Sequence, residues 1–349
     1  MIKYTSNLHE INNFDNVIDV RSPSEFDLDH IPNAINLPVL SDAERRLIGK
    51  TYTEISAFKA KITGATIVAQ NIAGHISREL DDKPKSWKPL IYCWRGGKRS
   101  KAMALIFKEI GWDVTVLKGG YKSYRRFIRQ EISEICSQLS LRVICGPTGS
   151  GKTEVLRSLI KYGSQVIDLE ALANHRGSVL GWIPNIAQGS QKFFETKIWA
   201  TLSAFDLGQP IFIESESKKI GNLQIPQPLI DKMWNSDCIV LDTDPILRIE
   251  LLMKDYQHLI DSPETLVSSL PPLIRNHGKK LIDSWIKLIY QKKWNIFVEE
   301  ILKKHYDPAY KKSIEQHYIK LGLATHHRID DPNEKTFTHI AMQLSNENK

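Results

Sequence analysis

Short apolar runs alternate with helix-spaced stretches through the first half of the chain. Three runs rich in β-branched or aromatic residues predict buried strands, at 16–21, 89–92 and 114–117. The polar stretch between the first two has helical spacing, and we expect it to break at three glycines: Gly49, Gly64 and Gly74. Strands that alternate with helices form a parallel sheet with covered faces, so this half predicts an α/β domain.

The second half repeats this alternation. Four apolar runs predict strands at 141–145, 165–168, 210–214 and 238–242, and the spacing from about Gly278 to Tyr310 is helical. A stretch without Pro or Gly, 121–139, joins the halves, and 349 residues suffice for two domains. We therefore predict one α/β domain at 1–138 and a second at 139–349, the latter with a basic helical C-terminal region.

The composition argues against several classes of protein. Apolar residues make up 42% and charged residues 25%, as in globular proteins. No apolar run approaches the about 20 residues of a membrane helix, and no secretory signal is readable, so we expect a cytoplasmic protein without membrane contact. Four cysteines without C-x-x-C spacing argue against a disulfide framework or a zinc cluster. The net charge of +7 fits a polyanionic partner without requiring one.

One cysteine stands in a loop suited to a reactive thiolate. The loop after the strand at 89–92 holds the cysteine, two glycines and three cations: Cys93, Arg95, Gly96, Gly97, Lys98 and Arg99. Backbone N–H groups of a glycine-rich turn before a helix converge on such a sulfur, and nearby cations favour its charged form. Cys93 is therefore the predicted nucleophile, whereas the other three cysteines lie in apolar contexts that predict plain burial.

Four segments of the first half resemble a rhodanese domain: Asp-Val-Arg at 19–21, His-Ile-Pro-Asn-Ala at 30–34, the Cys93 loop, and Gly-Gly-Tyr at 119–121. The resemblance implies a persulfide or perselenide on Cys93. The common rhodanese loop places its last cation at the position of Lys98, whereas Arg99 makes C-x5-R, a spacing that resembles the phosphatase branch of the fold. The group that Cys93 handles stays open at this stage.

The second half opens with a phosphate-binding motif. G-x-x-x-x-G-K-[ST] is matched in full after a strand and before a helix, and its predicted contact residues are Gly146, Gly149, Ser150, Gly151, Lys152 and Thr153. The glycines let backbone N–H groups surround a phosphate, Lys152 supplies a cation, and Thr153 can bind Mg²⁺. This half therefore predicts a P-loop NTPase-like α/β fold, although the motif specifies a phosphate and not ATP.

Polar residues follow the other strands of this half at the edge where open α/β sheets bind ligands. Glu214 and Asp168 are candidate metal or substrate carboxylates, and each could instead cap the next turn. A glycine-interrupted loop supplies further candidate substrate contacts: His175, Arg176 and Ser178.

Lysines alternate with aromatic residues between Lys279 and Lys304, and the aromatics are Trp285, Tyr290, Trp294 and Phe297. Cations and aromatic rings can hold phosphates and stack on unpaired bases. The alternative is a solvated helix with a packed aromatic face.

Together, the two halves resemble the tRNA 2-selenouridine synthase family. The resemblance also rests on separated segments of the second half: 168–170, 175–178, 214–217, 220–221 and 306–310. It implies replacement of sulfur by selenium at a wobble 2-thiouridine, with tRNA as substrate and selenophosphate as selenium donor. It further implies that geranyl diphosphate first alkylates the sulfur, and that no cofactor is tightly bound, with Mg²⁺ as an option.

Two other functions remain compatible with the residues. A P-loop kinase or ATP-dependent tRNA sulfurtransferase could activate uridine before sulfur transfer. A non-catalytic tRNA-binding or chalcogen-sensing module could use the P-loop as an anchor only.

Overall fold

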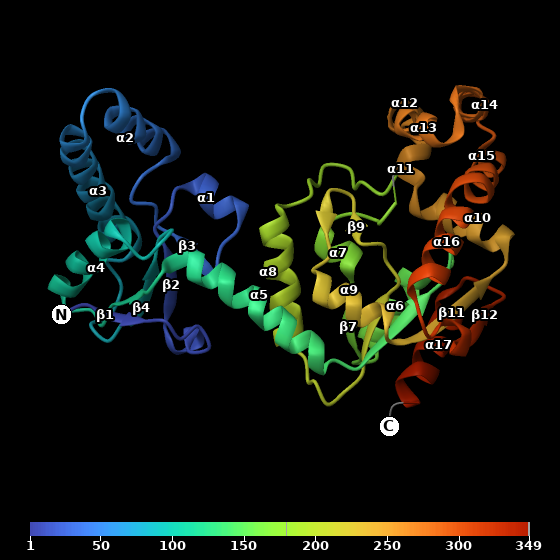
Figure 1. Cartoon of the computed structure of the whole chain (residues 1–349), viewed down its shortest axis with the longest axis horizontal. Coiled ribbons are helices and arrows are strands. Elements are labelled where there is room, and N and C mark those ends of the chain that lie inside the picture. Colours follow the sequence, from blue (N-terminus) through green and yellow to red (C-terminus); the bar gives the residue numbers. More distant parts are fainter. Residues whose placement is uncertain (179, 348–349) are drawn as a thin grey trace. The chain divides into compact units, whose positions relative to one another are not determined.

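The computed structural model describes residues 1–178 and 180–347, which form two compact units. Unit 1 comprises Met1–Glu131 and Ser190–Ala200, and unit 2 comprises Ile132–Gly189 and the chain from Thr201 onward. Helices α5 (Gly120–Gln138) and α8 (Gln191–Ser203) each begin in unit 1 and end in unit 2 (Figure 1). The return of the chain to unit 1 at residue 190 gave no signal in the sequence.

Unit 1 is built on a five-stranded parallel sheet with the order β1-β5-β4-β2-β3. In chain order its strands are β1 (Lys3–Thr5), β2 (Asn16–Asp19), β3 (Ala34–Asn36), β4 (Pro89–Tyr92) and β5 (Thr115–Leu117). The central strand β4 is buried along its whole length, because helices cover both sheet faces. The predicted parallel α/β architecture is confirmed, and β4 delivers Cys93 at its carboxyl end.

The helices of unit 1 besides α5 and α8 are α1 (Pro23–Leu28), α2 (Asp42–Glu54), α3 (Ala57–Glu79) and α4 (Lys98–Ile110). The expected breaks at three glycines are wrong, since Gly49 lies inside α2 and Gly64 and Gly74 inside α3. A helical glycine costs only about 1 kcal/mol, which packing readily offsets. At Gly64 a Cβ would lie 3.4 Å from Ile48 of α2, so the glycine permits a close approach of the two helices. The chain turns instead at Ser56, whose side chain caps α3.

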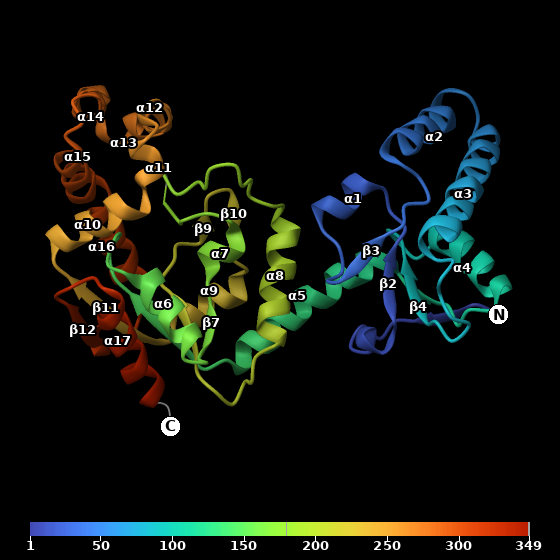
Figure 2. The ribbon, with the colours of Figure 1, turned by 180° about the vertical axis from the view of Figure 1, so that it is seen from behind.

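Unit 2 contains a second five-stranded sheet, with the order β12-β11-β6-β8-β7 and parallel neighbours (Figure 2). Its strands are β6 (Leu141–Cys145), β7 (Gln165–Ile167), β8 (Ile211–Glu214), β11 (Asp237–Thr243) and β12 (Thr325–Ile329). The remaining strands, β9 (Lys219–Ile220) and β10 (Leu223–Gln224), form an antiparallel pair. Four helices surround these sheets: α6 (Lys152–Lys161), α7 (Leu169–Ala173), α9 (Gln227–Trp234) and α17 (Glu334–Asn346). All four predicted strands are present, and β12 was missed.

Residues 245–317 form a helical cap with its own apolar core. Its elements are α10 (Pro245–Asp255), α11 (Gln257–Ile260), α12 (Pro263–Ser269), η2 (Pro271–Leu273), α13 (Ile274–His277), α14 (Lys279–Tyr290), α15 (Trp294–Ile301), the π-helix η3 (Leu302–Tyr306) and α16 (Asp307–His317). Trp285 and Phe297 are buried in this core, so the expectation that they stack on bases is wrong. The neighbouring lysines Lys287, Lys292 and Lys293 are exposed, as in the packed-face alternative. Contact of these lysines with tRNA stays a prediction.

Among the described residues, no helix combines the length and apolarity needed to cross a bilayer.

Candidate functional site

The sulfur of Cys93 sits in a closed turn between β4 and α4. The Gly97 N–H donates to Sγ at 3.2 Å and the Ser100 hydroxyl donates to it at 3.3 Å. Only 3% of the Cys93 surface is exposed, and Ser100 is fully buried. The Ser100 hydroxyl also lies 3.1 Å from the Gly97 carbonyl oxygen. The sulfur therefore has a backbone and a side-chain hydrogen-bond partner in a site from which most water is excluded.

These donors decide the acidity of the thiol. Burial raises the pKa of Cys93, but hydrogen bonds from the Ser100 hydroxyl and from the backbone of Ser100, Gly97 and Arg95 outweigh it, so the pKa lies below the ordinary thiol value. By contrast, burial raises the pKa of Cys136 to about 12. Ser100 is a functional residue that the sequence analysis missed, although its position in the first turn of the following helix was a usable signal.

The cationic side chains of the three loop residues Arg95, Lys98 and Arg99 are not among the described hydrogen-bond partners of the sulfur. Arg95 and Lys98 are exposed, while the guanidinium of Arg99 donates to Glu25 of α1 at 2.8 Å. Burial raises the pKa of Glu25, but the hydrogen bond and charge of Arg99 outweigh it and hold the pKa below the usual value. Arg99 therefore stabilises the loop through Glu25, which weakens the interpretation of C-x5-R as a phosphatase cradle.

Two glycines make the turn possible. Gly96 and Gly120 have φ values of +63° and +57°, in the left-handed region that glycine tolerates. A Cβ on Gly120 would lie 2.1 Å from the Cys93 carbonyl oxygen, which itself accepts a hydrogen bond from the Tyr121 N–H at 2.8 Å. The Gly-Gly-Tyr segment thus stabilises the Cys93 loop through contacts with its backbone.

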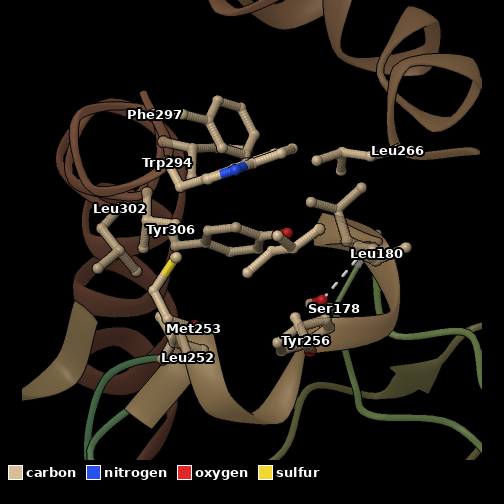
Figure 3. A pocket seen from close by; sticks show the side chains of 15 residues that line it. Ser178, Leu180, Leu252, Met253, Tyr256, Leu266, Trp294, Phe297, Leu302 and Tyr306 are labelled. Atoms are coloured by element: carbon tan, nitrogen blue, oxygen red, sulfur yellow. Dashed lines mark hydrogen bonds between the residues drawn. The ribbon is translucent and has the colours of Figure 1, made fainter. Parts of the chain in front are cut away.

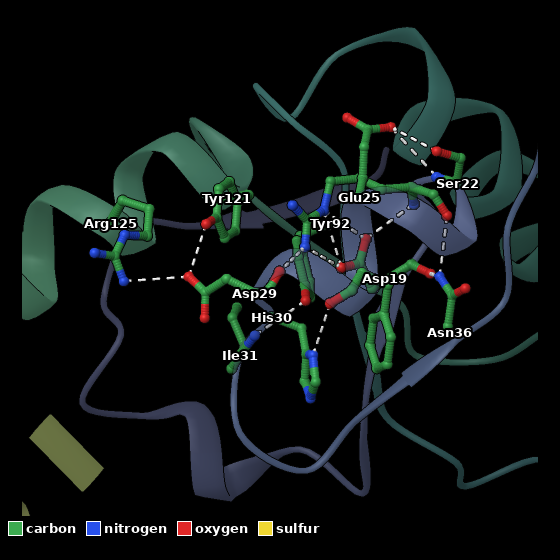
Figure 4. A network of polar contacts seen from close by, with 12 residues as sticks. Asp19, Ser22, Glu25, Asp29, His30, Ile31, Asn36, Tyr92, Tyr121 and Arg125 are labelled. Atoms are coloured by element: carbon green, nitrogen blue, oxygen red, sulfur yellow. Dashed lines mark hydrogen bonds and ion pairs between the residues drawn. The ribbon is translucent and has the colours of Figure 1, made fainter. Parts of the chain in front are cut away.

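A buried polar network joins the other rhodanese-like segments (Figure 4). The Arg21 guanidinium pairs with Asp19 at 2.6 Å and lies 3.9 Å from the centre of the Tyr121 ring. Asp29 accepts hydrogen bonds from the Tyr121 hydroxyl at 2.7 Å and from Arg125 at 3.1 Å. These residues position the segments that carry the resemblance, and their charges are matched inside the core as burial requires.

In unit 2 the P-loop lines a cavity of about 520 Å³. All the predicted phosphate-contact residues except Gly146 lie on its wall: Gly149, Ser150, Gly151, Lys152 and Thr153. Gly149 and Gly151 have φ values of +80° and +87°, which aim their backbone as a phosphate cradle requires. The Gly146 N–H donates to the Tyr310 hydroxyl at 2.7 Å, at the base of the loop.

Lys152 is free to meet an anion. Its ammonium group donates to the Gly146 carbonyl at 2.7 Å and lies 5.9 Å from the centre of the Tyr310 ring. Within the described part of the chain, no carboxylate forms an ion pair with it. A bound phosphate therefore gains a cation without having to displace an acidic partner.

Buried carboxylates form the opposite wall of this cavity. Glu214 accepts a hydrogen bond from the Glu170 N–H at 3.1 Å through Oε1, while its Oε2 is buried without a partner. A Cβ on Gly177 would lie 2.8 Å from Glu170 and 3.0 Å from Glu216, so these two carboxylates flank one glycine. Asp168 also lines the cavity, but it caps α7 by accepting from Ala171 N–H at 2.8 Å, as the capping alternative proposed.

Burial and mutual repulsion make these acids weak. Burial, reinforced by the neighbouring Glu216, raises the pKa of Glu170 to about 8, and burial raises that of Glu216 to about 7 despite the attraction of Lys152. Burial also raises the pKa of Glu214 well above its usual value. Glu170 and Glu216 are cavity residues that were not predicted, although both lie close to a predicted strand end. No group of three or more potential metal ligands is present in residues 1–178 and 180–347, and the Mg²⁺ option stays a prediction.

The predicted substrate loop does reach the P-loop cavity. His175, Arg176 and Ser178 all lie on its wall. Burial lowers the pKa of His175, so its ring is more readily neutral. Arg176 lies 5.1 Å from the centre of the Tyr256 ring and donates to the Asp255 carbonyl, which fixes its guanidinium at the rim. The structure thus brings the two predicted groups of unit 2 together.

These geometries define a class of protein: a rhodanese-like domain with a low-pKa cysteine, joined to a P-loop domain with a cavity at its P-loop. Family models agree with this division. Residues 3–126 match the rhodanese-like domain, and residues 139–268 match the tRNA 2-selenouridine synthase AAA domain.

Comparison with known proteins identifies the family within this class. The chain is 32% identical over 286 residues to the tRNA 2-selenouridine synthase of Nitrosomonas europaea, an alignment that covers 77% of this chain and 73% of that one. It is 29% identical over 332 residues to the synthase of Sulfurovum sp., covering 87% and 90% of the two chains. The chain belongs to the tRNA 2-selenouridine synthase family.

Proposed function

We propose that this chain converts a wobble 2-thiouridine of tRNA into 2-selenouridine. Selenophosphate is the selenium donor, and geranyl diphosphate first alkylates the sulfur, so that sulfur departs as a thiol rather than as a poor leaving group. The observation that carries the proposal is the combination, in one chain of this family, of the hydrogen-bonded Cys93 sulfur with an anion cavity whose lysine has no carboxylate partner.

Cys93 is the residue that handles the selenium donor. Its lowered pKa gives a larger thiolate fraction at neutral pH than an ordinary cysteine has. The exposed cations Arg95 and Lys98 stand on the same loop and attract the anionic donor. The turn therefore offers a reactive sulfur and a charged approach within a few residues.

The oxidation state of selenium restricts the chemical role that Cys93 can have. Selenium has the same oxidation state in selenophosphate and in 2-selenouridine, so transfer needs neither an oxidant nor a reductant. The donor selenium attacks C2 of the S-alkylated uridine, the C–S bond breaks, the alkyl thiol leaves, and water then cleaves the Se–P bond to release phosphate. A perselenide on Cys93 would need a two-electron oxidation that no participant supplies. Cys93 thus orients the donor and acts as a base: its thiolate accepts a proton from the donor as the selenium attacks, and returns it to the departing thiol.

The P-loop binds the diphosphate of the alkyl donor. Backbone N–H groups of the loop and the Lys152 ammonium neutralise the departing diphosphate during transfer of the geranyl group to sulfur. Thr153 and the carboxylates of Glu214 and Asp168 line the same cavity, so Mg²⁺ at this point remains part of the proposal.

The test is mass spectrometry of nucleosides from thiolated tRNA incubated with the purified chain and both co-substrates. The expected products are S-geranyl-2-thiouridine when selenophosphate is left out, and 2-selenouridine when both are present. ATP should have no effect. Modification that requires ATP instead of geranyl diphosphate would support the kinase-like alternative, and absence of any modified nucleoside would support a binding module.

A further inference from the structure

A second, apolar pocket adjoins the phosphate cavity of unit 2. The two share five lining residues at their junction: Thr148, Ser178, Leu252, Tyr256 and Tyr306. Beyond the junction, side chains from the helical cap enclose the pocket, and Figure 3 shows Trp294, Phe297 and Leu266 pointing into it. We call this pocket the tail chamber.

We infer that the tail chamber binds the hydrocarbon tail of the diphosphate ester held by the P-loop and selects that tail by length. The identity of the ester rests on the proposed function. Most of its lining comes from the helical cap, and the phosphate motif contributes only Thr148 at the junction, so the chamber assigns this specificity to the cap.

Polarity separates the chamber from the phosphate cavity. Among the described lining residues, side-chain hydroxyls occur only on Thr148, Ser178, Tyr256 and Tyr306, which are all junction residues. The other lining side chains are apolar, apart from the Trp294 indole N–H: Leu180, Met253, Leu259, Ile260, Leu266, Trp294, Phe297, Val298, Ile301 and Leu302. A nucleoside base would lose its hydrogen bonds to water there without replacement, whereas a hydrocarbon loses none.

The chamber favours a short tail. Its volume is about 60 Å³, less than half of the roughly 150 Å³ of an engineered cavity that holds benzene, so it admits only the first few carbons of a tail unless a side chain of its wall swings aside. Met253 lies in its wall, and its unbranched side chain can adapt to a slender ligand. Phe297, Leu266 and Ile301 are buried in the core of the cap and set the depth of the chamber.

Binding to the full chain tests this inference without tRNA or selenium. Calorimetry would compare pyrophosphate with dimethylallyl, geranyl and farnesyl diphosphates. Each buried methylene strengthens binding by about fourfold. We therefore expect geranyl diphosphate to bind at least about 100-fold more tightly than pyrophosphate, with farnesyl diphosphate gaining little more.

Two variants alter the chamber. Met253→Trp fills it and should weaken geranyl diphosphate at least about 30-fold, whereas Trp294→Ala enlarges it and should improve farnesyl relative to geranyl diphosphate about tenfold. Ile296→Ala, on the exposed side of α15, is the matched control and should change neither. Unchanged pyrophosphate binding shows that each variant keeps its P-loop.

The inference is overturned if geranyl diphosphate binds the unaltered chain no more tightly than pyrophosphate, or if both chamber variants keep its length preference. Its failure is distinct from failure of the proposed function. Chamber binding without any tRNA modification would refute the proposed reaction alone, whereas tRNA geranylation with a length preference insensitive to both variants would refute the chamber alone.

Discussion

The Cys93 loop and the P-loop have the same strand–turn–helix arrangement, but they differ in how much space each leaves for a ligand. Each is a glycine-bent turn between a buried parallel strand and a helix, the arrangement in which backbone N–H groups can bind an anion. The Cys93 turn closes around one sulfur atom, and the residue is only 3% exposed, while the P-loop opens onto a cavity of about 520 Å³.

The difference in space between the two loops determines which interactions each site can use. At Cys93 the hydrogen bonds converge on one sulfur atom, so that site depends on the acidity of this atom. In unit 2 several buried carboxylates have raised pKa values, and the P-loop cavity has room for a large ligand that can contribute binding energy. We therefore expect single-atom changes to dominate the first site and charge changes to dominate the second.

The largest effect is expected for Cys93→Ala. Loss of the sulfur should lower selenouridine formation by about a thousandfold or more, since no other cysteine of the described chain has a comparable donor pair. S-geranylated tRNA should still accumulate, as measured by nucleoside mass spectrometry. Cys136→Ala is the control and should leave both products unchanged. Undiminished selenation by Cys93→Ala would remove this residue from the reaction.

Lys152→Ala should slow geranylation about 100-fold, because the departing diphosphate loses its side-chain cation. Lys161→Ala lies at the end of the same helix, where its ammonium pairs with Glu334, and serves as a matched control of equal charge change. Initial rates of S-geranyl-2-thiouridine formation give the comparison. Equal rates for the two variants would mean that the P-loop serves another ligand.

Ser100→Ala should slow selenation about tenfold at neutral pH, since a hydrogen bond to a charged acceptor contributes about 1.5 kcal/mol. The variant raises the pKa of Cys93 because the thiolate loses a donor, so the thiolate fraction falls at pH 7 and recovers as the pH rises. Alkylation of Cys93 by iodoacetamide, followed by peptide mass spectrometry across pH, measures this shift. An unshifted profile would show that the backbone donors suffice.

The smallest effect concerns the buried acids of unit 2. Below their raised pKa values of about 7 and about 8, Glu216 and Glu170 hold protons and are neutral. As the pH rises through this range they ionise beside the diphosphate, and binding of geranyl diphosphate should weaken about fivefold by pH 9. Glu216→Gln should reduce this loss in calorimetric titrations. An identical pH dependence in the variant would place the ionising group elsewhere.

The sequence missed three edge strands, β1, β3 and β12, most of whose residues are exposed or half-buried. It predicted the other strands of the two five-stranded sheets, because these are short apolar runs before turns. It predicted the position of Cys93 and of the P-loop for the same reason. It failed at Gly49, Gly64 and Gly74, where packing between α2 and α3 overrides the local preference of glycine.

The partners of the site residues were harder to predict. In the sequence Arg99 is one of three loop cations, but in the structure it forms an ion pair with Glu25, which is distant in sequence. Glu170 and Glu216 meet only because the loop folds so that Gly177 lies between them. The tail chamber joins residues from 148 to 306 and has no local pattern, since its aromatic members follow ordinary helical spacing.

An experiment that passes one tRNA from the first variant to a second tests most directly whether the two sites perform separate steps. Thiolated tRNA would be treated with Cys93→Ala and geranyl diphosphate, purified away from the protein, and then given to Lys152→Ala with selenophosphate alone. We predict that nucleoside mass spectrometry finds 2-selenouridine after the second step, although neither variant makes it at an appreciable rate from thiolated tRNA. Geranylated tRNA that remains unchanged in the second step, while the unaltered chain converts it, would contradict the division of labour between Cys93 and the P-loop.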